Sequence, residues 1–359
     1  NNAPSHTTER SLLSLTETVQ ILKYDLGLDA VLAWHALPGY WLGCAEPTSN
    51  VDNRIKMTPS TIQYPHFPFG IMENDSSASR EQSVTKGIGI ANDATQFLSQ
   101  YHAYLQGCGI DGVKVDAQAV TGILRPHPPE NKNGKDGEIS RSKKSHAHEV
   151  ALCLHNDLAL SMERHFGGAC FDRPVSTSAP IVHCMSHAPE IFYRMPSLYG
   201  NTRLPLMRAS DDHYPNNPYS HGPHIVACAF NSLLLGLVTV PDWDMFTTMI
   251  TSDMTPDMVW IHAIARAISG GPVYLSDKPH ETNSAILESL VCKDGTVLTC
   301  TKSAVPTRDC LLRNPLSCSH THIFKVQNVN GKRGAYTSGV LGLFHVGGTG
   351  EWDAAKLDY

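Results

Sequence analysis

Two groups of carboxylates follow apolar runs that have the pattern of buried strands. Asp116 closes the run Gly112–Asp116, and the adjacent Asp211 and Asp212 come shortly after the run Leu204–Arg208. Breaking or transferring a glycosidic bond takes two carboxyl groups, one ionised at the anomeric carbon and one protonated beside the leaving oxygen. The sequence therefore favours a carbohydrate-active site that pairs Asp116 with one of the two later aspartates.

Charged neighbours predict which carboxyl has which role. Lys114 lies two residues before Asp116 on the same predicted strand, so both side chains point to the same face. An ammonium there would hold Asp116 ionised, as an attacking carboxylate requires. Asp211 and Asp212 repel each other, which raises the pKa of one of them and suits a general acid. The plainer alternative is that the two aspartates cap a helix and that Lys114 and Asp116 form a structural ion pair.

Aromatic side chains stand at or just after predicted strand ends, at Trp34, Tyr40, Trp41 and Trp243. A flat ring can stack on the C–H face of a sugar, which makes Trp34 and Trp243 candidate substrate-binding residues. Taken singly, such aromatic residues more often belong to the core.

Other catalytic chemistries lack their motifs. The chain has 19 histidines, but the closest pairs, His146 with His148 and His183 with His187, form neither HExxH nor a closed ligand set. We therefore expect no metal and no other cofactor. A Ser/His/Asp hydrolase is disfavoured because no GxSxG sequence is present.

These residues need a scaffold that brings strand ends together. Helical stretches alternate with short apolar runs along the chain, which is typical of a parallel sheet with helical crossovers. The predicted helices are 9–24, 92–106, 145–166, 224–235 and 258–269, and the predicted strands are 30–33, 112–116, 180–185, 204–208, 237–240 and 272–275.

The predicted fold class is α/β, as a (β/α)8 TIM-type barrel. Polar residues cluster where the predicted strands stop, and a barrel gathers those ends at one mouth. A doubly wound sheet would carry a Gly-rich phosphate turn after a strand, and residues 87–91 lack its third glycine. With about six of the eight strands recognisable, the predicted barrel is incomplete.

The pattern changes near residue 290. Beyond it, apolar residues alternate with period two around Asp-Gly and Asn-Gly turns, which indicates antiparallel hairpins. We expect residues 1–290 to form the partial catalytic barrel, with loop insertions at 44–86 and 125–145. Residues 291–359 would begin a C-terminal antiparallel β domain.

Composition excludes several other classes of protein. The chain has 359 residues, 41% of them hydrophobic and 17% charged, which suits a large folded core and not a disordered protein. A formal charge of −6 argues against nucleic acid as a partner. The longest apolar stretch, Ile225–Val240, is too short for a membrane span. The ten cysteines include no CxxC pair, which favours buried thiols in a reducing compartment. The first residues lack the pattern of a signal peptide, so we expect a cytoplasmic location, and the missing initiator Met suggests a fragment.

Six segments between residues 28 and 352 form a familiar series. They are AWHALPGYW at 33–41, GIDGVKVDAQ at 109–118, RASDD at 208–212, PDWDMF at 241–246, SDKP at 276–279 and PTRDC at 306–310. In this order they resemble the raffinose synthase and seed imbibition protein group, the plant-type alkaline α-galactosidase relatives in glycoside hydrolase family 36. The resemblance implies a (β/α)8 catalytic barrel and retaining chemistry on α-galactosides.

The resemblance also implies catalytic roles. Asp116 corresponds to the nucleophile. In the related α-galactosidases an arginine that contacts the sugar precedes the acid/base by four positions, as Arg208 precedes Asp212 here. Asp212 is therefore the favoured acid/base, with Asp211 as the alternative.

The implied ligands are small sugars. Lys114, Arg208 and Asp244 would bind sugar hydroxyls. The substrates would be an α-galactoside, or galactinol together with a sucrose-like acceptor, with no nucleic acid and no membrane involved. Hydrolysis and transfer differ only in whether water or a sugar hydroxyl attacks the covalent intermediate, so both stay open.

The chain also departs from the family pattern. Set against the family pattern, this sequence is expected to start after the N-terminal β domain and the first barrel strands, including the Asp-Asp-Gly-Trp segment that binds galactose in the relatives. Ser186 stands where relatives usually have Cys, and His280 where they usually have Gly. These differences support a second hypothesis, a truncated and inactive relative that binds sugar or a protein partner.

Overall fold

The structure is a computed structural model of the 359-residue chain. It describes residues 13–37, 57–58, 60–62, 90–91, 94–119, 121, 124–126, 147–167, 181–195, 204–317, 323–331 and 337–347.

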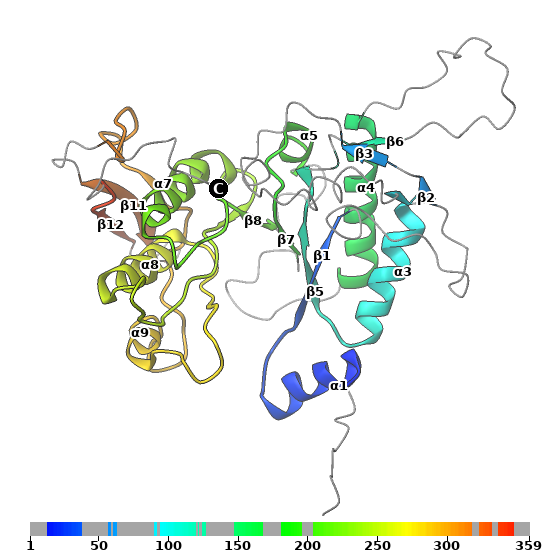
Figure 1. Ribbon diagram of the computed structural model, residues 1–359, viewed down its shortest axis with the longest axis horizontal. Coiled ribbons are helices and arrows are strands. Elements are labelled where there is room, and N and C mark those ends of the chain that lie inside the picture. The colour runs from blue at the N-terminus through cyan, green and yellow to red at the C-terminus, as the bar shows by residue number, and fades with distance from the viewer. Residues whose placement is uncertain are drawn as a thin grey trace, which may run out of the picture.

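A parallel sheet of five strands runs through the middle of the described chain (Figure 1). Its order is β1-β5-β7-β8-β9, and each strand pairs with the next in parallel. The strands span Leu32–Ala36, Gly112–Asp116, Ile181–His183, Leu206–Arg208 and Val240–Asp242. Parallel neighbours in chain order, joined by helices, are the arrangement that the alternating sequence predicts.

Strand β5 shows how the sequence builds this sheet. It is paired on both sides, with β1 and with β7, and both Val113 and Val115 are fully buried. Branched side chains of this kind pack well on a pleated surface. The register places Ala36 of β1 opposite Asp116, so the two strands end at the same level.

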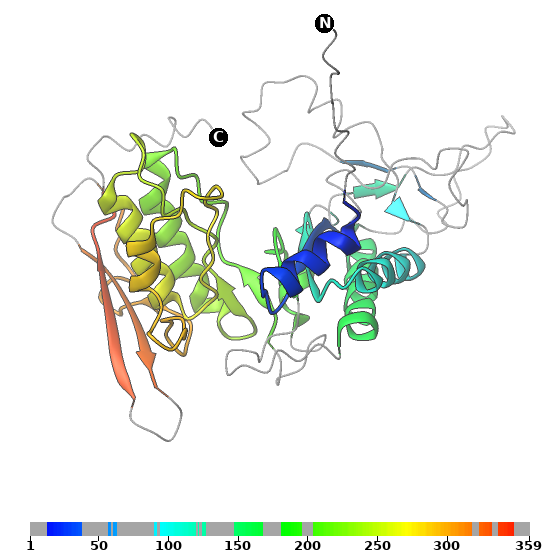
Figure 2. The same cartoon turned by 90° about the horizontal axis from the view of Figure 1, so that it is seen from below.

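Two helices, α3 (Ala94–Gly107) and α4 (Ala147–Phe166), pack side by side next to the first half of the sheet (Figures 1 and 2). Their apolar faces and the strands share one core. Its buried members include Leu98, Leu105, Val113, Val115, Leu154, Leu158 and Met162.

The first described helix completes this core. Helix α1 (Leu15–Gln20) buries Val19 there and continues into a π-helical turn, η1 (Ile21–Asp25). A capping box starts α1: the Glu17 N–H donates to Ser14 Oγ, and the Ser14 N–H donates to the Glu17 carboxylate. Two backbone donors that the helix leaves unpaired are satisfied in this way.

A second core forms around α7 (Pro218–Leu235) and α8 (Pro256–Ser269). Its buried members include Met207, Ile225, Cys228, Trp243, Ile268, Phe324 and Phe344. Helix α8 starts at the Thr255 cap, whose hydroxyl accepts the Met258 N–H, and ends at Gly270 in the left-handed conformation with φ 77°. A Cβ at Gly270 would collide with the Lys302 carbonyl, so the chain needs glycine there. Two short helices, α5 (Pro189–Phe192) and α9 (Ser284–Ser289), also lie within the described residues.

The C-terminal strands form a small antiparallel sheet of order β10-β11-β12, with bounds Val305–Pro306, Phe324–Asn330 and Ser338–Phe344. This sheet packs on α7 and α8 and contributes to their core. Antiparallel strands were predicted in this part of the chain.

Two further antiparallel pairs lie at the predicted insertions. Strand β2 (Met57–Thr58) pairs with β4 (Ile90–Ala91), and β3 (Ser60–Ile62) pairs with β6 (Leu124–Pro126). Residues 57–58 and 60–62 were predicted as loop. The remainder of 44–86 and of 125–145 lies outside the described residues.

Several predicted elements differ in the structure. The strand predicted at 30–33 lies at Leu32–Ala36, so Trp34 is inside the strand and not after its end. The strand predicted at 272–275 is reduced to one parallel bridge, between Phe246 and Leu275. The strand predicted at 237–240 lies instead at Val240–Asp242, because residues 236–238 form the turn that ends α7. Helix α7 begins earlier than predicted, at Pro218, because Asn217 caps it and proline needs no N–H partner in the first turn.

Within the described residues the parallel sheet is open, with β1 and β9 at its edges. The predicted (β/α)8 barrel is therefore represented by five neighbouring parallel strands and not by a closed ring.

The described cysteines are all free thiols, buried at Cys108, Cys184, Cys228, Cys300 and Cys310 and exposed at Cys153 and Cys292. Among the helices of the described ranges, none combines the length and the apolar character that crossing a membrane would take.

Candidate active site

Several of the predicted site residues lie along one edge of the parallel sheet, at the carboxyl ends of its strands, while Trp34 and Lys114 lie within β1 and β5, two residues before those ends. Asp116 ends β5, Arg208 ends β8 and Asp242 ends β9, and the register places Arg208 opposite Asp242. Only β7 separates β5 from β8, and two interstrand spacings amount to about 10 Å. The sheet therefore brings Asp116 and the segment after β8 to the same edge.

The Asp116 carboxylate is held by two donors. Its Oδ1 accepts the Ala117 N–H at 2.7 Å, and its Oδ2 accepts Trp34 Nε1–H at 3.1 Å. The residue is 8% exposed. One oxygen is thus fixed by the backbone and the other by a neighbouring strand, which suits a carboxylate that must point at one atom of a substrate.

Lys114 does not form the predicted ion pair with Asp116. Among the ion pairs of the described residues, none joins these two side chains. Trp34, which is opposite Lys114 in the strand register, donates to the carboxylate instead. An indole N–H thus takes the place at Asp116 that we expected for the ammonium.

Cys184, directly after β7, connects the two halves of the site. Its N–H donates to the Val115 carbonyl at 2.8 Å. Burial is the main cause that raises the pKa of its thiol to about 12; Arg208 opposes this rise and Asp116 adds to it. Because β7 pairs with both β5 and β8, the ends of these two strands lie on either side of Cys184.

Arg208 gathers three carboxylates around one buried guanidinium. Its Nη2 lies 2.5 Å from Asp244 Oδ1, its Nη1 lies 2.8 Å from Asp212 Oδ1, and its Nε lies 4.0 Å from Asp242 Oδ2. Burial acts to lower the pKa of Arg208, but the Asp244 and Asp242 carboxylates outweigh it and raise the pKa above its usual value. Arg208 therefore ties the ends of β8 and β9 to the loop that carries Asp212.

Asp244 is fixed from several sides. Its Oδ2 accepts the His213 N–H and its Oδ1 accepts the Met245 N–H, each at 2.7 Å. Burial raises the pKa of Asp244, while Arg208 and the His213 N–H oppose that rise. The nearby Asp242 carboxylate accepts the Asp244 N–H at 2.8 Å.

The two candidate acid/base residues differ in their surroundings. The Asp212 side chain is 66% exposed and binds Arg208. Asp211 is exposed as well; desolvation is the main cause that raises its pKa, and the adjacent Asp212 adds to it. The direction of this shift is the one that repulsion between adjacent carboxylates predicts.

The two aromatic residues predicted to bind substrate, Trp34 and Trp243, lie in different surroundings. Trp34 is 42% exposed and touches Asp116, so it can take part in a sugar site. Trp243 is fully buried in the second core, and its Nε1–H donates to Ser232 Oγ at 3.0 Å. Because a fully enclosed ring offers no face to a ligand, the stacking role predicted for Trp243 is not supported.

Several members of the site were not recognised in the sequence. Tyr274 donates its hydroxyl to Asp242 Oδ2 at 2.7 Å, and His187 Nε2–H donates to the Arg208 carbonyl at 2.6 Å. Cys184 and the His213 N–H complete this group. No local motif marks these residues, since they meet only once the strands are aligned; the nearest signal was their position at or just beyond predicted strands.

Backbone strain accompanies these side chains. Ala117, Met185 and Asp244 have φ of 54°, 44° and 70°, and each lies just after β5, β7 or β9. A left-handed conformation costs a non-glycine residue roughly 1 kcal/mol or more. Such strain is typical of sites where the backbone must aim a particular group.

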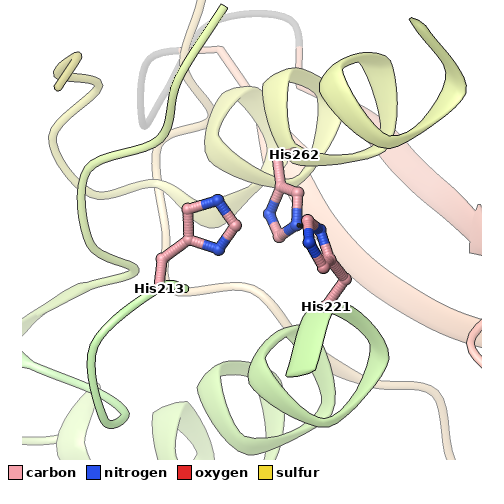
Figure 3. Close-up of side chains that lie close together, drawn as sticks. All are labelled: His213, His221 and His262. Atoms are coloured by element: carbon pink, nitrogen blue, oxygen red, sulfur yellow. Dashed lines mark hydrogen bonds between the residues drawn. The ribbon is translucent and has the colours of Figure 1, made fainter. Parts of the chain in front are cut away.

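Three buried histidines lie beside this site, from the loop after β8, from α7 and from α8. His213, His221 and His262 each place one ring nitrogen within 4.8 Å of the others (Figure 3). They are the only such set of possible metal ligands in the described part of the chain. The pairs considered from the sequence are different ones, and His146 lies outside the described residues.

Comparison with known sequences identifies the family. The family described as "Raffinose synthase or seed imbibition protein Sip1" matches residues 1–356. A probable galactinol–sucrose galactosyltransferase 6 of Arabidopsis thaliana is 33% identical over 347 residues, which are 96% of this chain and 39% of that protein. A galactinol–sucrose galactosyltransferase of Pisum sativum is 32% identical over 90% of this chain and 36% of its own length. A stachyose synthase of Pisum sativum is 31% identical over 91% of this chain and 34% of its own length.

The chain spans well under half the length of these relatives. Two solved structures are also similar to it. A GH27 β-L-arabinopyranosidase from Geobacillus stearothermophilus has a TM-score of 0.40 and 16% identity, over 68% of this chain and 52% of that one. An α-galactosidase from Thermus thermophilus in complex with stachyose has a TM-score of 0.32 and 12% identity, over 57% of this chain and 39% of that one.

The family match extends over nearly the whole sequence, and on that ground the chain belongs to the raffinose synthase or seed imbibition protein Sip1 family.

Proposed function

We propose that this chain carries the active site of an enzyme that cleaves or transfers α-galactosyl groups with retention of configuration. The observation that carries the proposal is the Arg208 cluster, in which one buried guanidinium binds Asp212 and Asp244 at the sheet edge where Asp116 ends β5. Two carboxyl groups with separate roles at one site are what double displacement needs. The printed names of the relatives, galactinol–sucrose galactosyltransferase and stachyose synthase, support α-galactosyl chemistry.

In the first step, an oxygen of Asp116 would attack the anomeric carbon while the acid/base residue protonates the leaving oxygen. The glycosidic bond breaks and a galactosyl ester of Asp116 forms. In the second step, water or an acceptor hydroxyl gives its proton to the same acid/base residue and attacks the anomeric carbon, which releases Asp116. The hydrogen bonds from Ala117 N–H and Trp34 Nε1 keep the carboxylate oriented for both steps.

Asp212 is our favoured acid/base and Asp211 is the alternative. Asp212 binds Arg208 in the free site, but its exposed side chain has room to turn toward a leaving group. Asp211 has the raised pKa expected of an acid. Lys114, Arg208 and Asp244 would bind sugar hydroxyls, and Trp34 would line the sugar site.

We further propose that the sheet belongs to a (β/α)8 barrel. In a closed barrel, further strands would pair with the open edges of β1 and β9. The free thiols of the described residues support a reducing, cytoplasmic location.

The test uses the full-length gene product that contains this chain. Incubation with galactinol and sucrose, followed by sugar chromatography, should show raffinose if the enzyme transfers galactose and free galactose if it hydrolyses the donor. Asp116→Asn should lower turnover by at least about 10³-fold. Asp309→Asn, on the exposed Asp309–Lys325 ion pair, is the matched control and should retain activity.

A fluorinated, activated galactoside that slows the second step should label Asp116 covalently, and peptide mass spectrometry would locate the label. Full turnover in Asp116→Asn, or a label on another carboxylate, contradicts the assignment. Calorimetric binding of raffinose by a wild-type protein without turnover would instead support the inactive sugar-binding relative.

A further inference from the structure

A second buried guanidinium, that of Arg266 on α8, lies behind the site. It is 0% exposed. Its Nε donates to the Asp244 carbonyl and its Nη2 to the Met245 carbonyl, each at 3.1 Å. No ion pair of the described residues includes it. Arg266 thus holds the backbone of the left-handed Asp244 turn, whose carboxylate binds Arg208.

The third interaction of Arg266 fixes the proton of a histidine. Arg266 Nη1 lies 2.6 Å from His262 Nδ1. A guanidinium only donates hydrogen bonds, so His262 Nδ1 must accept, and the proton of the neutral ring is on Nε2. His262 is fully buried, which favours the neutral ring.

The next histidine continues the same direction. His262 Nε2 lies 2.6 Å from His221 Nδ1, so His262 donates and His221 accepts. The His221 proton is then on Nε2, which donates to the Pro215 carbonyl at 3.3 Å. Arg266, His262, His221 and Pro215 form one directional hydrogen-bond chain, which we call the histidine chain. Figure 3 shows the His262 and His221 rings close together, with His213 beside them.

This direction of donation disfavours a metal at the three histidines. A metal on His262 Nε2 would displace the proton to Nδ1, where it would face the Arg266 donor at 2.6 Å. The metal would also add positive charge beside a buried guanidinium. His213 leaves both ring nitrogens without a hydrogen-bond partner in the described structure, but one free ring does not compensate for that conflict.

The two ends of the histidine chain are both attached to the candidate site. At one end Arg266 holds the Asp244 backbone; at the other, His221 holds the Pro215 carbonyl in the loop that follows Asp211 and Asp212. We propose that His262 and His221 are positioning residues, which through Arg266 and Pro215 set the Asp244 turn against the loop that bears the acid/base. This inference rests on the proposed function.

The surroundings of His262 make this arrangement sensitive to protonation. The groups that face it are Arg266 on its own helix, His221 and His224 on α7, and His213 on the loop after β8. Burial, followed by the charge of Arg266, lowers the pKa of His262 well below its usual value. Protonation at Nδ1 would remove the acceptor of Arg266 and place two like charges together.

Two substitutions of His262 separate positioning from packing. His262→Asn keeps an oxygen that can accept from Arg266 Nη1, and His262→Leu keeps bulk but offers no acceptor. We expect the Asn variant to stay within a few-fold of wild type in kcat/KM, and the Leu variant to lose about 10²-fold through a higher KM and a lower kcat, since Asp244 and the acid/base loop both shift. A merely smaller folded fraction would lower the apparent kcat and leave KM unchanged.

A measurement on the wild-type protein covers the case in which His262→Leu does not fold. Nitrogen-15 NMR of histidine-labelled full-length protein should show His262 and His221 neutral, with the proton on Nε2, and added Zn²⁺ should not bind stoichiometrically. A proton on His262 Nδ1, one equivalent of zinc that His262→Asn abolishes, or equal and undiminished activity of both variants would overturn the proposal. Absence of galactosyl turnover in the wild type would refute the proposed function alone, because the NMR and zinc results do not depend on it.

Discussion

Trp34 Nε1, from the middle of β1, and Asp116 Oδ2, at the end of β5, lie 3.1 Å apart. The indole of one strand thereby orients the candidate nucleophile of the next. This contact assigns Trp34 a role that differs from sugar stacking alone, because the ring edge and not only its face would matter for turnover.

Trp34→Phe keeps an aromatic ring and removes the N–H. Loss of one hydrogen bond to a carboxylate corresponds to about 1.5 kcal/mol, so kcat/KM should fall about 10-fold. The free energy of unfolding should change little, because Trp34 is 42% exposed. Steady-state kinetics and urea unfolding check both values. Trp260→Phe on α8, where the ring is 41% exposed, is the matched control and should behave as wild type; an equally active Trp34→Phe contradicts the orienting role.

Asp211→Asn and Asp212→Asn decide which residue is the acid/base. The true acid/base variant should lose about 10²- to 10⁴-fold on a galactoside with a poor leaving group. It should lose much less on an aryl galactoside whose leaving group departs without protonation. The pH profile of kcat/KM should also lose its alkaline limb in that variant. If Asp211→Asn shows this pattern and Asp212→Asn does not, our preference for Asp212 is wrong.

Arg208→Met should destabilise the fold as well as the site. The substitution leaves Asp242 and Asp244 buried without their cation, which costs about 3–5 kcal/mol. Urea unfolding followed by circular dichroism measures this loss. Adding Asp244→Asn to Arg208→Met should restore part of it, whereas Lys325→Met, in an exposed pair, should leave stability nearly unchanged. A mild effect of Arg208→Met would show that the three carboxylates do not depend on its charge.

His155→Leu should make the protein less sensitive to acid. Burial lowers the pKa of His155 to about 3, and its Nε2 is buried without a hydrogen-bond partner. Below pH 6.5 His155 binds a proton in the unfolded chain but stays neutral in the folded chain. The free energy of unfolding therefore falls as the pH falls from 6.5 toward 3. The wild type should therefore lose about 2 kcal/mol at pH 5 through His155, and the Leu variant should avoid that loss. Urea unfolding at pH 7.5 and pH 5 tests this; parallel losses in both proteins would contradict it.

Local patterns in the sequence predicted much of the scaffold. The strand Gly112–Asp116 has its predicted bounds, and α3, α4 and α8 lie close to theirs, because apolar periodicity and helix caps act over a few residues. The helix predicted at 224–235 begins six residues earlier, at Pro218, and runs through Pro223, although proline inside a helix is normally disfavoured. The prediction of a strand at 272–275 was wrong, because an apolar run does not show whether a partner strand lies beside it.

The position of a residue at the carboxyl end of a predicted strand predicted only part of the site. Asp116 and the pair Asp211 and Asp212 were predicted from such positions, whereas the roles of Arg208 and Asp244 came from the resemblance to the family. The structure brings Asp212 and Asp244 together around the Arg208 guanidinium. The hydrogen bond from Trp34 to Asp116 was not predictable, because Trp34 comes from the neighbouring strand β1. The ion pair expected between Lys114 and Asp116 is not formed. The histidines at 213, 221 and 262 have no common spacing, and they meet only because α7 and α8 pack against the loop after β8.

The left-handed turns at Ala117, Met185 and Asp244 have a consequence for engineering this chain. At Ala117, glycine would relieve this strain but loosen the backbone that holds the Asp116 carboxylate. At Asp244, glycine would also remove the buried carboxylate that binds Arg208, and so destabilise the fold. Stabilising substitutions should therefore be sought on the exposed faces of α3, α4 and α8, where they would not change the orientation of the site residues.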